Sequence, residues 1–337
     1  MKGRQVRPPS VVIGSSDVVR REDRLRQLEM AVTRKLDGLL QGDHQGLVPG
    51  GGTEPADGRL YAPGDDVRRM DWNLTARTGV PHVRTTIADR ELETWLVIDG
   101  SASLDFGTTT CEKRDLALAA AAAFTFLTVR GGNRIAASIF GPQEAPGGSG
   151  AGGPGGAGAS PGGPGGSGAS PGGMVIPPRG GRSAALALLR RLEQRGRAAG
   201  GPSTTLAEAL RRIRLTAKRR GLVVLITDLI DQSPWQRELR ALALTHEVVV
   251  VEVRDPRESS LPAVGLLMLV DPETGQRLEV QTSNAAVRAR FAEAAAARQA
   301  QNARQVRGTG AAHLVLSTDR DWLFDVVRFV AARRHRR

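Results

Sequence analysis

One short stretch of the sequence combines a buried type of strand with oxygen-bearing side chains at a regular spacing. The apolar run from Trp95 to Ile98 ends at Asp99, and Ser101 and Ser103 follow at intervals of two residues. A continuous apolar run of this length is typical of a strand that is buried on both faces. One carboxylate and two hydroxyls are hard oxygen ligands that suit Mg²⁺, but they are too few to surround it. The stretch therefore needs partners from elsewhere in the chain.

A second apolar run supplies a matching carboxylate. The run that begins at Leu222 ends at Asp228, and Thr204 lies in a polar segment directly before a predicted helix. In open α/β sheets, ligands bind at the carboxyl ends of the strands, where the strand order reverses. One cation would then be faced by two carboxylates and three hydroxyls, which belong to Asp99, Ser101, Ser103, Thr204 and Asp228.

These side chains have an alternative interpretation as helix caps. The sequence offers other caps for the neighbouring helices, because Thr-x-x-Glu capping boxes begin at Thr109 and Thr205, and Ser233 precedes a proline at a helix start. The candidate ligands are left without an obvious capping role, which favours the metal site.

The elements that position the site alternate between strands and helices. Strands are predicted at 94–99, 135–140, 174–176, 222–227, 247–253 and 313–316, and helices at 112–130, 183–195, 205–219, 284–304 and 320–334. Another helix starts after Ser233, and 264–270 with 277–281 are expected to form a hairpin. The alternation predicts an α/β fold with a doubly wound, mostly parallel sheet and helices on both faces.

Three parts are expected along the chain. Residues 1–57 hold a helix at about 22–40 and a linker, residues 58–92 form a signature segment that packs on the main domain, and residues 93–337 form that domain. Residues 142–173 are almost entirely Gly, Pro, Ser and Ala, which cannot bury a core and predict a disordered insert. If strands 94–99 and 135–140 are parallel, this insert leaves the sheet beside the metal site, and we expect it to shield or tether that face.

Composition favours a soluble cytoplasmic protein. Cys111 is the single cysteine of the chain, which excludes an internal disulfide and indicates a reducing compartment. The longest apolar tract, Leu116 to Val129, is too short to span a bilayer.

The formal charge of +12 is unevenly placed. Residues 181–220 hold eleven Lys and Arg against Glu193 and Glu208, a net charge of +9. Such a segment can meet nucleic acid or an acidic surface, or it can be a solvated face. No aromatic residue lies within it, which weakens a platform for stacking single-stranded bases.

A polar, turn-rich segment precedes the main domain. Its distinctive residues are Tyr61, Gly64, Asp65, Asp66, Arg68, Asp71, Trp72 and Arg77. The three acids could form a second metal site. We favour a structural interpretation, in which they make turn, helix-cap and ion-pair contacts with the two arginines while the two aromatic rings pack.

The order Asp-x-Ser-x-Ser, then Thr, then Asp after an apolar strand resembles a von Willebrand factor A domain with its metal-ion-dependent adhesion site. Tyr-x-Pro-Gly-Asp-Asp-x-Arg-x-x-Asp-Trp, followed by Val83-Arg84 and the Asp99 strand, resembles domain-of-unknown-function family fifty-eight over about residues 58–335. This resemblance implies that Asp99, Ser101, Ser103, Thr204 and Asp228 hold Mg²⁺, with Mn²⁺ or Ca²⁺ as alternatives. It also implies a partner, either a MoxR-type AAA+ ATPase or another protein that presents an acidic residue. The Gly-rich insert departs from the family pattern.

The sequence thus favours a non-enzymatic, metal-dependent protein-binding module that acts as an adaptor or co-chaperone. A Mg²⁺-dependent phosphatase or nuclease using Asp99 or the Asp65, Asp66 and Asp71 trio is the second interpretation. Against it, position 101 carries no carboxylate to act as a general acid, and no phosphate-binding loop or hydrolase motif is present. Nucleic-acid binding through residues 181–220 is the third.

Overall fold

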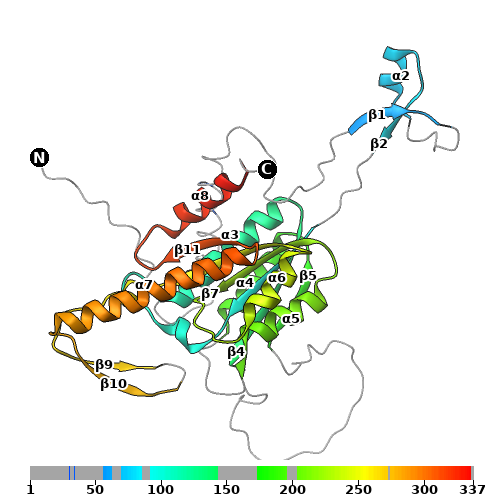
Figure 1. Cartoon of the computed structure of the whole chain (residues 1–337). Helices are drawn as coiled ribbons and strands as arrows, with labels where there is room; N and C mark the ends of the chain where they lie inside the picture. The colour runs from blue at the N-terminus through cyan, green and yellow to red at the C-terminus, as the bar shows by residue number, and fades with distance from the viewer. Residues whose placement is uncertain are drawn as a thin grey trace, which may run out of the picture.

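The computed structural model describes residues 30, 34, 56–62, 70–85, 92–142, 173–195, 203–271 and 274–334. A mostly parallel sheet stands at its centre, with helices on both faces (Figure 1). This confirms the predicted α/β, doubly wound fold. The predicted helix at about 22–40 falls almost entirely outside the described residues, and so does the Gly-rich insert.

The parallel strands of the described sheet stand in the order β11–β8–β7–β3–β4. Their bounds are β3 (Glu93–Asp99), β4 (Arg134–Pro142), β7 (Gly221–Thr227), β8 (Glu247–Arg254) and β11 (Ala312–Ser317). Beyond them, β5 (Val175–Arg179) and the short β6 (Ser203–Thr204) both pair antiparallel with β4. All seven residues of β3 are buried, as its apolar run predicts.

The strand order reverses next to β3. The chain passes from β3 to β4 on one side, whereas β7, β8 and β11 lie in succession on the other side. Such a reversal opens a crevice at the carboxyl ends of the strands, because the connections on its two sides diverge. Asp99 ends β3 at this point, and Asp228 directly follows β7.

The helices form two layers, one on each face of the sheet. One layer contains α3 (Lys113–Arg130), α4 (Arg182–Glu193) and α8 (Trp322–Arg334), and the other contains α5 (Leu206–Thr216), α6 (Trp235–Ala243) and α7 (Ala285–Gly308). Alternate residues of β3 serve the two layers: Leu96 and Ile98 pack with the first, and Trp95 and Val97 with the second. The Ala-rich α3 is buried almost all round, since its small side chains let it lie close to the sheet.

Two of the predicted helix caps are wrong. Helix α3 begins after Glu112, which forms the capping box in place of Thr109. The Ser233 hydroxyl accepts a hydrogen bond from the Ala207 amide at the start of α5, 3.2 Å away, and does not cap the helix that follows it. The capping box that begins at Thr205 is confirmed. The α3 cap is thus still local but lies three residues further on, whereas Ser233 serves a helix that precedes it in the chain.

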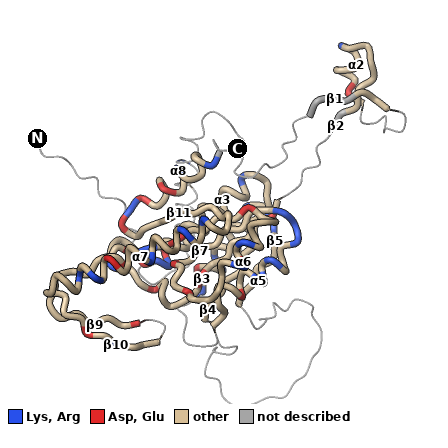
Figure 2. The backbone as a smooth tube through the Cα atoms, viewed as in Figure 1, with Lys and Arg blue, Asp and Glu red and all other residues tan. Residues whose placement is uncertain are grey.

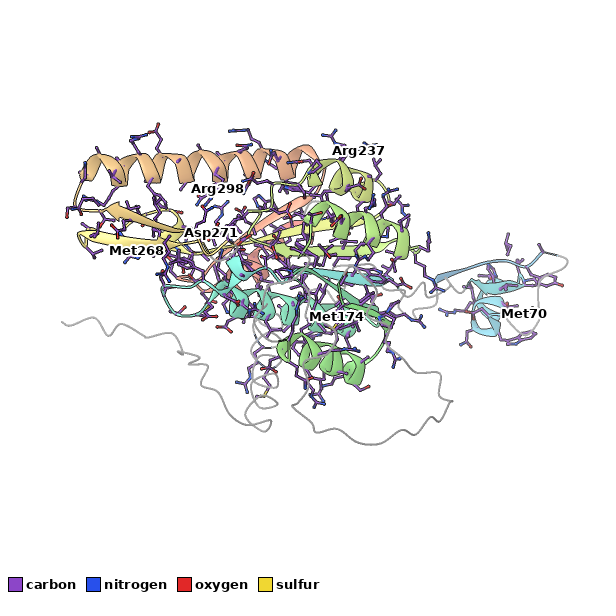
Figure 3. All side chains as sticks on the ribbon, turned by 90° about the horizontal axis from the view of Figure 1, so that it is seen from below. Met70, Met174, Arg237, Met268, Asp271 and Arg298 are labelled. Carbon is purple, nitrogen blue, oxygen red and sulfur yellow. The ribbon has the colours of Figure 1, made fainter. Side chains whose placement is uncertain are left out.

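A two-stranded hairpin and the longest helix extend from one side of the sheet. The hairpin consists of β9 (Leu266–Val270) and β10 (Arg277–Gln281), paired in antiparallel fashion as predicted. Figure 3 shows the hairpin, with Met268 and Asp271, alongside α7, which carries Arg298.

The described part of the signature segment folds as a small separate unit. It contains β1 (Ala56–Leu60), α2 (Trp72–Thr78) and β2 (His82–Thr85), and Figure 1 draws it apart from the main sheet. Its packing on the main domain stays a prediction.

The polar residues of that segment have mixed outcomes. Asp71 caps α2, because its carboxylate accepts hydrogen bonds from the backbone amides of Asn73 and Leu74 in the first turn of that helix, both at 3.1 Å. This confirms its predicted role as a helix cap. Trp72 is 66% exposed, so the prediction that its ring packs is wrong. Tyr61 is half-buried, and the Arg77 Nε donates to a backbone carbonyl of α2 at 3.4 Å. The remaining signature residues, Gly64, Asp65, Asp66 and Arg68, lie outside the described residues.

Candidate metal centre at the carboxyl edge of the sheet

The Asp99 loop holds its three predicted ligands close together. The buried Asp99 carboxylate accepts a hydrogen bond from the Ser101 amide at 2.9 Å. The Ser101 and Ser103 hydroxyls lie 2.9 Å apart, at the start of the 3-10 helix η2 (Ala102–Asp105). Ser101 stands at the N-cap position of this helix, but its side chain makes no capping hydrogen bond. The Ser101 hydroxyl can therefore turn towards a cation without uncapping this helix.

Asp228 lies at the same edge because β7 is the parallel neighbour of β3. The Thr227 hydroxyl donates a 2.7 Å hydrogen bond to the second oxygen of Asp99, so it ties the ends of the two strands together. Asp228 is buried, and one of its oxygens accepts the Ile230 amide at 3.2 Å. Two buried carboxylates thus stand side by side where the strand order reverses.

Thr204 reaches the site through the end of β4. It pairs with Gly141 in the antiparallel contact between β6 and β4. Gly141 has a φ of +101°, and a Cβ there would lie 2.9 Å from the Ser101 nitrogen. A glycine is required at this position, because both the left-handed backbone and the close approach exclude a side chain. Thr204 is therefore separated from the Asp99 loop by the backbone of one residue, and the structure brings all five predicted residues to one edge.

Burial and the charge of Asp228 both disfavour the ionised form of Asp99. Burial, and after it the negative charge of Asp228, raise the pKa of Asp99 from 3.8 to about 6, although hydrogen bonds from Ser101 and Thr227 act in the opposite direction. A divalent cation between the two acids would relieve this repulsion.

A buried lysine at the site was missed by the sequence reasoning. Lys113 is fully buried at the first position of α3, and its Nζ lies 2.7 Å from Asp228 Oδ2 and 2.6 Å from Glu258 Oε1. Burial acts to lower the pKa of Lys113, but the charges of Asp228 and Glu258 outweigh it and raise the pKa. One signal was available: a lysine in the first turn of a helix opposes the helix dipole and needs acidic partners.

A third strand end carries another acid that the sequence reasoning missed. Asp255 follows β8 and is buried, and its oxygens accept hydrogen bonds from the Thr108 hydroxyl, the Thr108 amide and the Thr318 hydroxyl at 2.6 to 2.9 Å. It also accepts the Arg257 amide at 2.9 Å. Asp255 thus ties together the loop before α3 and the ends of β8 and β11.

The donor set fits a hard divalent cation. Carboxylate and hydroxyl oxygens suit Mg²⁺, which keeps several water ligands when the protein offers few charged ones. Within the described ranges, no three His, Cys, Asp or Glu side chains gather into a metal-holding group. A cation at this edge would therefore need the hydroxyls of Ser101, Ser103 and Thr204 in addition to the two carboxylates.

Comparison with known proteins assigns the chain to one family. The model of the family described as "Protein of unknown function DUF58" matches residues 57–151 and 169–301. The chain belongs to the DUF58 family. The described signature residues and the candidate metal centre of this DUF58 protein both lie inside the matched ranges.

Its curated relatives include mycobacterial proteins. The uncharacterized proteins Rv1480 of Mycobacterium tuberculosis and Mb1516 of Mycobacterium bovis are each 49% identical over 329 residues, which cover 98% of this chain and 95% of the relative. The uncharacterized protein MAV169 of Mycobacterium avium is 45% identical over 159 residues, covering 47% of this chain and 94% of its own.

Solved structures similar to this DUF58 protein include BatB from Bacteroides thetaiotaomicron, at 11% identity and a TM-score of 0.42, covering 72% of this chain and 99% of that one. A von Willebrand factor type A protein from Catenulispora acidiphila matches at 13% identity and a TM-score of 0.30, covering 51% of this chain and 34% of that one. These scores are low, and the fold assignment rests on the sheet topology itself.

None of the helices in the described ranges has the length and apolar character needed to span a bilayer.

Proposed function

We propose that this DUF58 protein is a non-enzymatic, metal-dependent protein-binding module. Asp99, Ser101, Ser103, Thr204 and Asp228 hold Mg²⁺, with Mn²⁺ or Ca²⁺ as alternatives, and the cation accepts a carboxylate from a partner. The partner is a MoxR-type AAA+ ATPase or another protein that presents an acidic residue, and this chain serves it as an adaptor or co-chaperone.

The observation that supports the proposal is that two buried carboxylates and the Ser101 and Ser103 hydroxyls lie together where the strand order reverses, with Thr204 paired to Gly141 at the neighbouring strand end. Hydroxyls are weak ligands, so a cation held this way keeps an open position for an outside ligand. A carboxylate is the natural ligand for that position, because it adds the negative charge that a Mg²⁺ site with few charged ligands lacks.

The ends of the Gly-rich insert support its predicted place beside the metal centre. Strands β3 and β4 are parallel, so Pro142, the last described residue before the insert, lies at the same edge as Asp99. After the insert, the Met174 carbonyl accepts a 2.9 Å hydrogen bond from the amide of Ile139, the residue before Phe140, which pairs with Asp99. Both flanks thus lie on the face from which a partner would approach, and we propose that the insert shields or tethers it.

The structure offers little to the other two interpretations. An enzyme that forms a phospho-aspartate on Asp99 would need a general acid two positions later, where this chain carries Ser101. Six of the basic residues of 181–220 lie on two helices that cover opposite faces of the sheet: three on α4 and three on α5. Figure 2 shows Lys and Arg spread over several elements, including α7.

Calorimetric titration of Mg²⁺ and Mn²⁺ into chelator-treated protein tests the metal centre. We expect saturable binding in the native chain, no binding in Asp99→Ala, and weaker binding in Thr204→Val, which removes a hydroxyl at constant volume. Asp319→Ala is the matched control, since Asp319 is an exposed acid outside the site. A native chain that binds neither cation, even with an acidic peptide present, would contradict the proposal.

A pair of peptides tests the open position. A labelled peptide with one glutamate should bind in Mg²⁺ and dissociate on adding EDTA, and its glutamine twin should not bind. The same EDTA and Asp99→Ala dependence is expected with a purified MoxR-type ATPase from the same genome. Binding that survives EDTA but falls steeply with salt would indicate the basic residues instead.

A further inference from the structure

We propose that Lys113 sets the cation affinity of this centre, acting as a fixed internal positive charge that weakens Asp228 as a ligand. This inference rests on the proposed function and adds its regulation: the site would hold its cation firmly when a partner's carboxylate completes it, and loosely otherwise.

The first support is that Asp228 is already engaged on both oxygens. Lys113 occupies Oδ2 at 2.7 Å, and the Ile230 amide donates to Oδ1 at 3.2 Å. A carboxylate has further lone pairs, so Asp228 can still contact a cation or its water. The hydrogen-bonded ammonium group of Lys113, however, neutralises part of the negative charge that Asp228 would offer to the cation.

The second support is the charge of the cluster. The carboxylates of Asp99, Asp228 and Glu258 against the ammonium of Lys113 leave a formal charge of −2, which one divalent cation balances. Without the lysine, the same cluster would carry −3 and would attract a cation more strongly at equal geometry. Lys113 therefore lowers the attraction of the site for any cation that enters it.

The third support is that a lysine at this position is unfavourable for the stability of the fold. The residue is fully buried in the first turn of a helix, where the dipole disfavours positive charge and burial of an ammonium group is costly. Two acids from different loops are needed to hold it. Glu258 lies in the turn η3 (Pro256–Glu258), and its other oxygen accepts the Asp255 amide at 3.1 Å. The lysine thus links the metal centre to the end of β8.

Two substitutions of opposite charge effect separate this role from a merely structural one. Lys113→Met keeps the volume and makes the cluster more negative, so Mg²⁺ should bind about tenfold more tightly. Glu258→Gln makes the cluster less negative and leaves the lysine to Asp228 alone, so Mg²⁺ should bind about tenfold more weakly. Loss of a structural ion pair would weaken binding in both variants. Glu293→Gln, an exposed acid on α7, is the matched control.

A trivalent ion keeps the test decisive if Lys113→Met does not fold. An electrostatic effect grows with ion charge, so Glu258→Gln should weaken Tb³⁺ binding, followed by its luminescence, about thirtyfold where Mg²⁺ loses about tenfold. Equal losses for both ions, or two variants that shift affinity in the same direction, would overturn the role of Lys113 and leave the metal centre intact. A native chain that binds no cation with or without the acidic peptide would overturn both proposals.

Discussion

Replacing Asp99 by asparagine should stabilise the metal-free protein at neutral pH while abolishing its metal binding. At pH 7.5 the buried Asp99 is ionised next to Asp228, which burial and repulsion both disfavour. Asparagine removes the charge, and its side-chain oxygen can still accept the Ser101 amide that Asp99 accepts at 2.9 Å. Its amide group can donate to the Thr227 hydroxyl, which would reverse the present hydrogen bond.

The magnitude follows from the pKa of Asp99, which is raised from 3.8 to about 6. A shift of this size corresponds to about 3 kcal/mol as an upper bound, at roughly 1.4 kcal/mol per pKa unit. The folded state binds the proton more tightly than the unfolded state, so the ionised carboxyl destabilises the fold above pH 6. This effect fades as pH falls and is absent below about pH 4. Asp99→Asn should therefore exceed the native chain in stability by about 1.5 to 3 kcal/mol at pH 7.5, the range in which half to all of this penalty is relieved. The difference should be small at pH 4.

Urea unfolding in EDTA at both pH values measures this difference, and Asp319→Asn serves as the exposed control. Added Mg²⁺ should then raise the free energy of unfolding of the native chain but not that of Asp99→Asn, because a ligand stabilises the state that binds it. The reasoning would be refuted if Asp99→Asn were less stable than the native chain at pH 7.5 without metal, or if the difference between them did not change with pH.

Three further predictions concern the frame of the site. Gly141→Ala should abolish Mg²⁺ binding and cost more than about 1 kcal/mol of stability, because its Cβ would lie 2.9 Å from the Ser101 nitrogen. Gly310→Ala is the control for backbone strain alone, since Gly310 has a φ of +85° and open space around it. Equal losses of stability in the two variants would contradict the contact argument. Asp255→Asn should lower the free energy of unfolding by about 2 kcal/mol or more, since it disturbs several buried hydrogen bonds, and chemical denaturation with no measurable change would rule this out. Deleting 144–172 should leave the free energy of unfolding unchanged and alter the affinity for the partner, and an unaltered affinity would end the shielding hypothesis.

The candidate site was largely predictable because each residue carries a local signal. Asp99 and Asp228 end apolar runs that are too short for buried helices, so the runs indicate strands and the acids mark their carboxyl ends. Thr205 caps α5 through its own side chain, and Thr204 before it pairs with Gly141 at the end of β4. Parallel pairing of β3 with β7 then brings the two acids together.

The residues that surround the site gave weaker signals. Lys113 pairs with acids 115 and 145 positions away, and a predicted helix start does not say which carboxylates will meet its side chains. Ser233 failed as a predicted cap for a related reason, because its hydroxyl serves a helix that precedes it in the chain. Trp72 was expected to pack and is exposed, since an aromatic ring in a short helix specifies no partner surface.

By itself, the sequence determined the strand and helix alternation, the doubly wound sheet and the five oxygen-bearing residues at its edge. These depend on the length of apolar runs and on residues adjacent to them, so they are local properties of the chain. Only the tertiary structure decided that Thr204 reaches the Asp99 loop through Gly141, that Asp99 and Asp228 share a buried setting, and that Lys113 joins them. Those facts depend on which distant side chains meet in a medium of low polarity, where each charge is strongly felt by its neighbours.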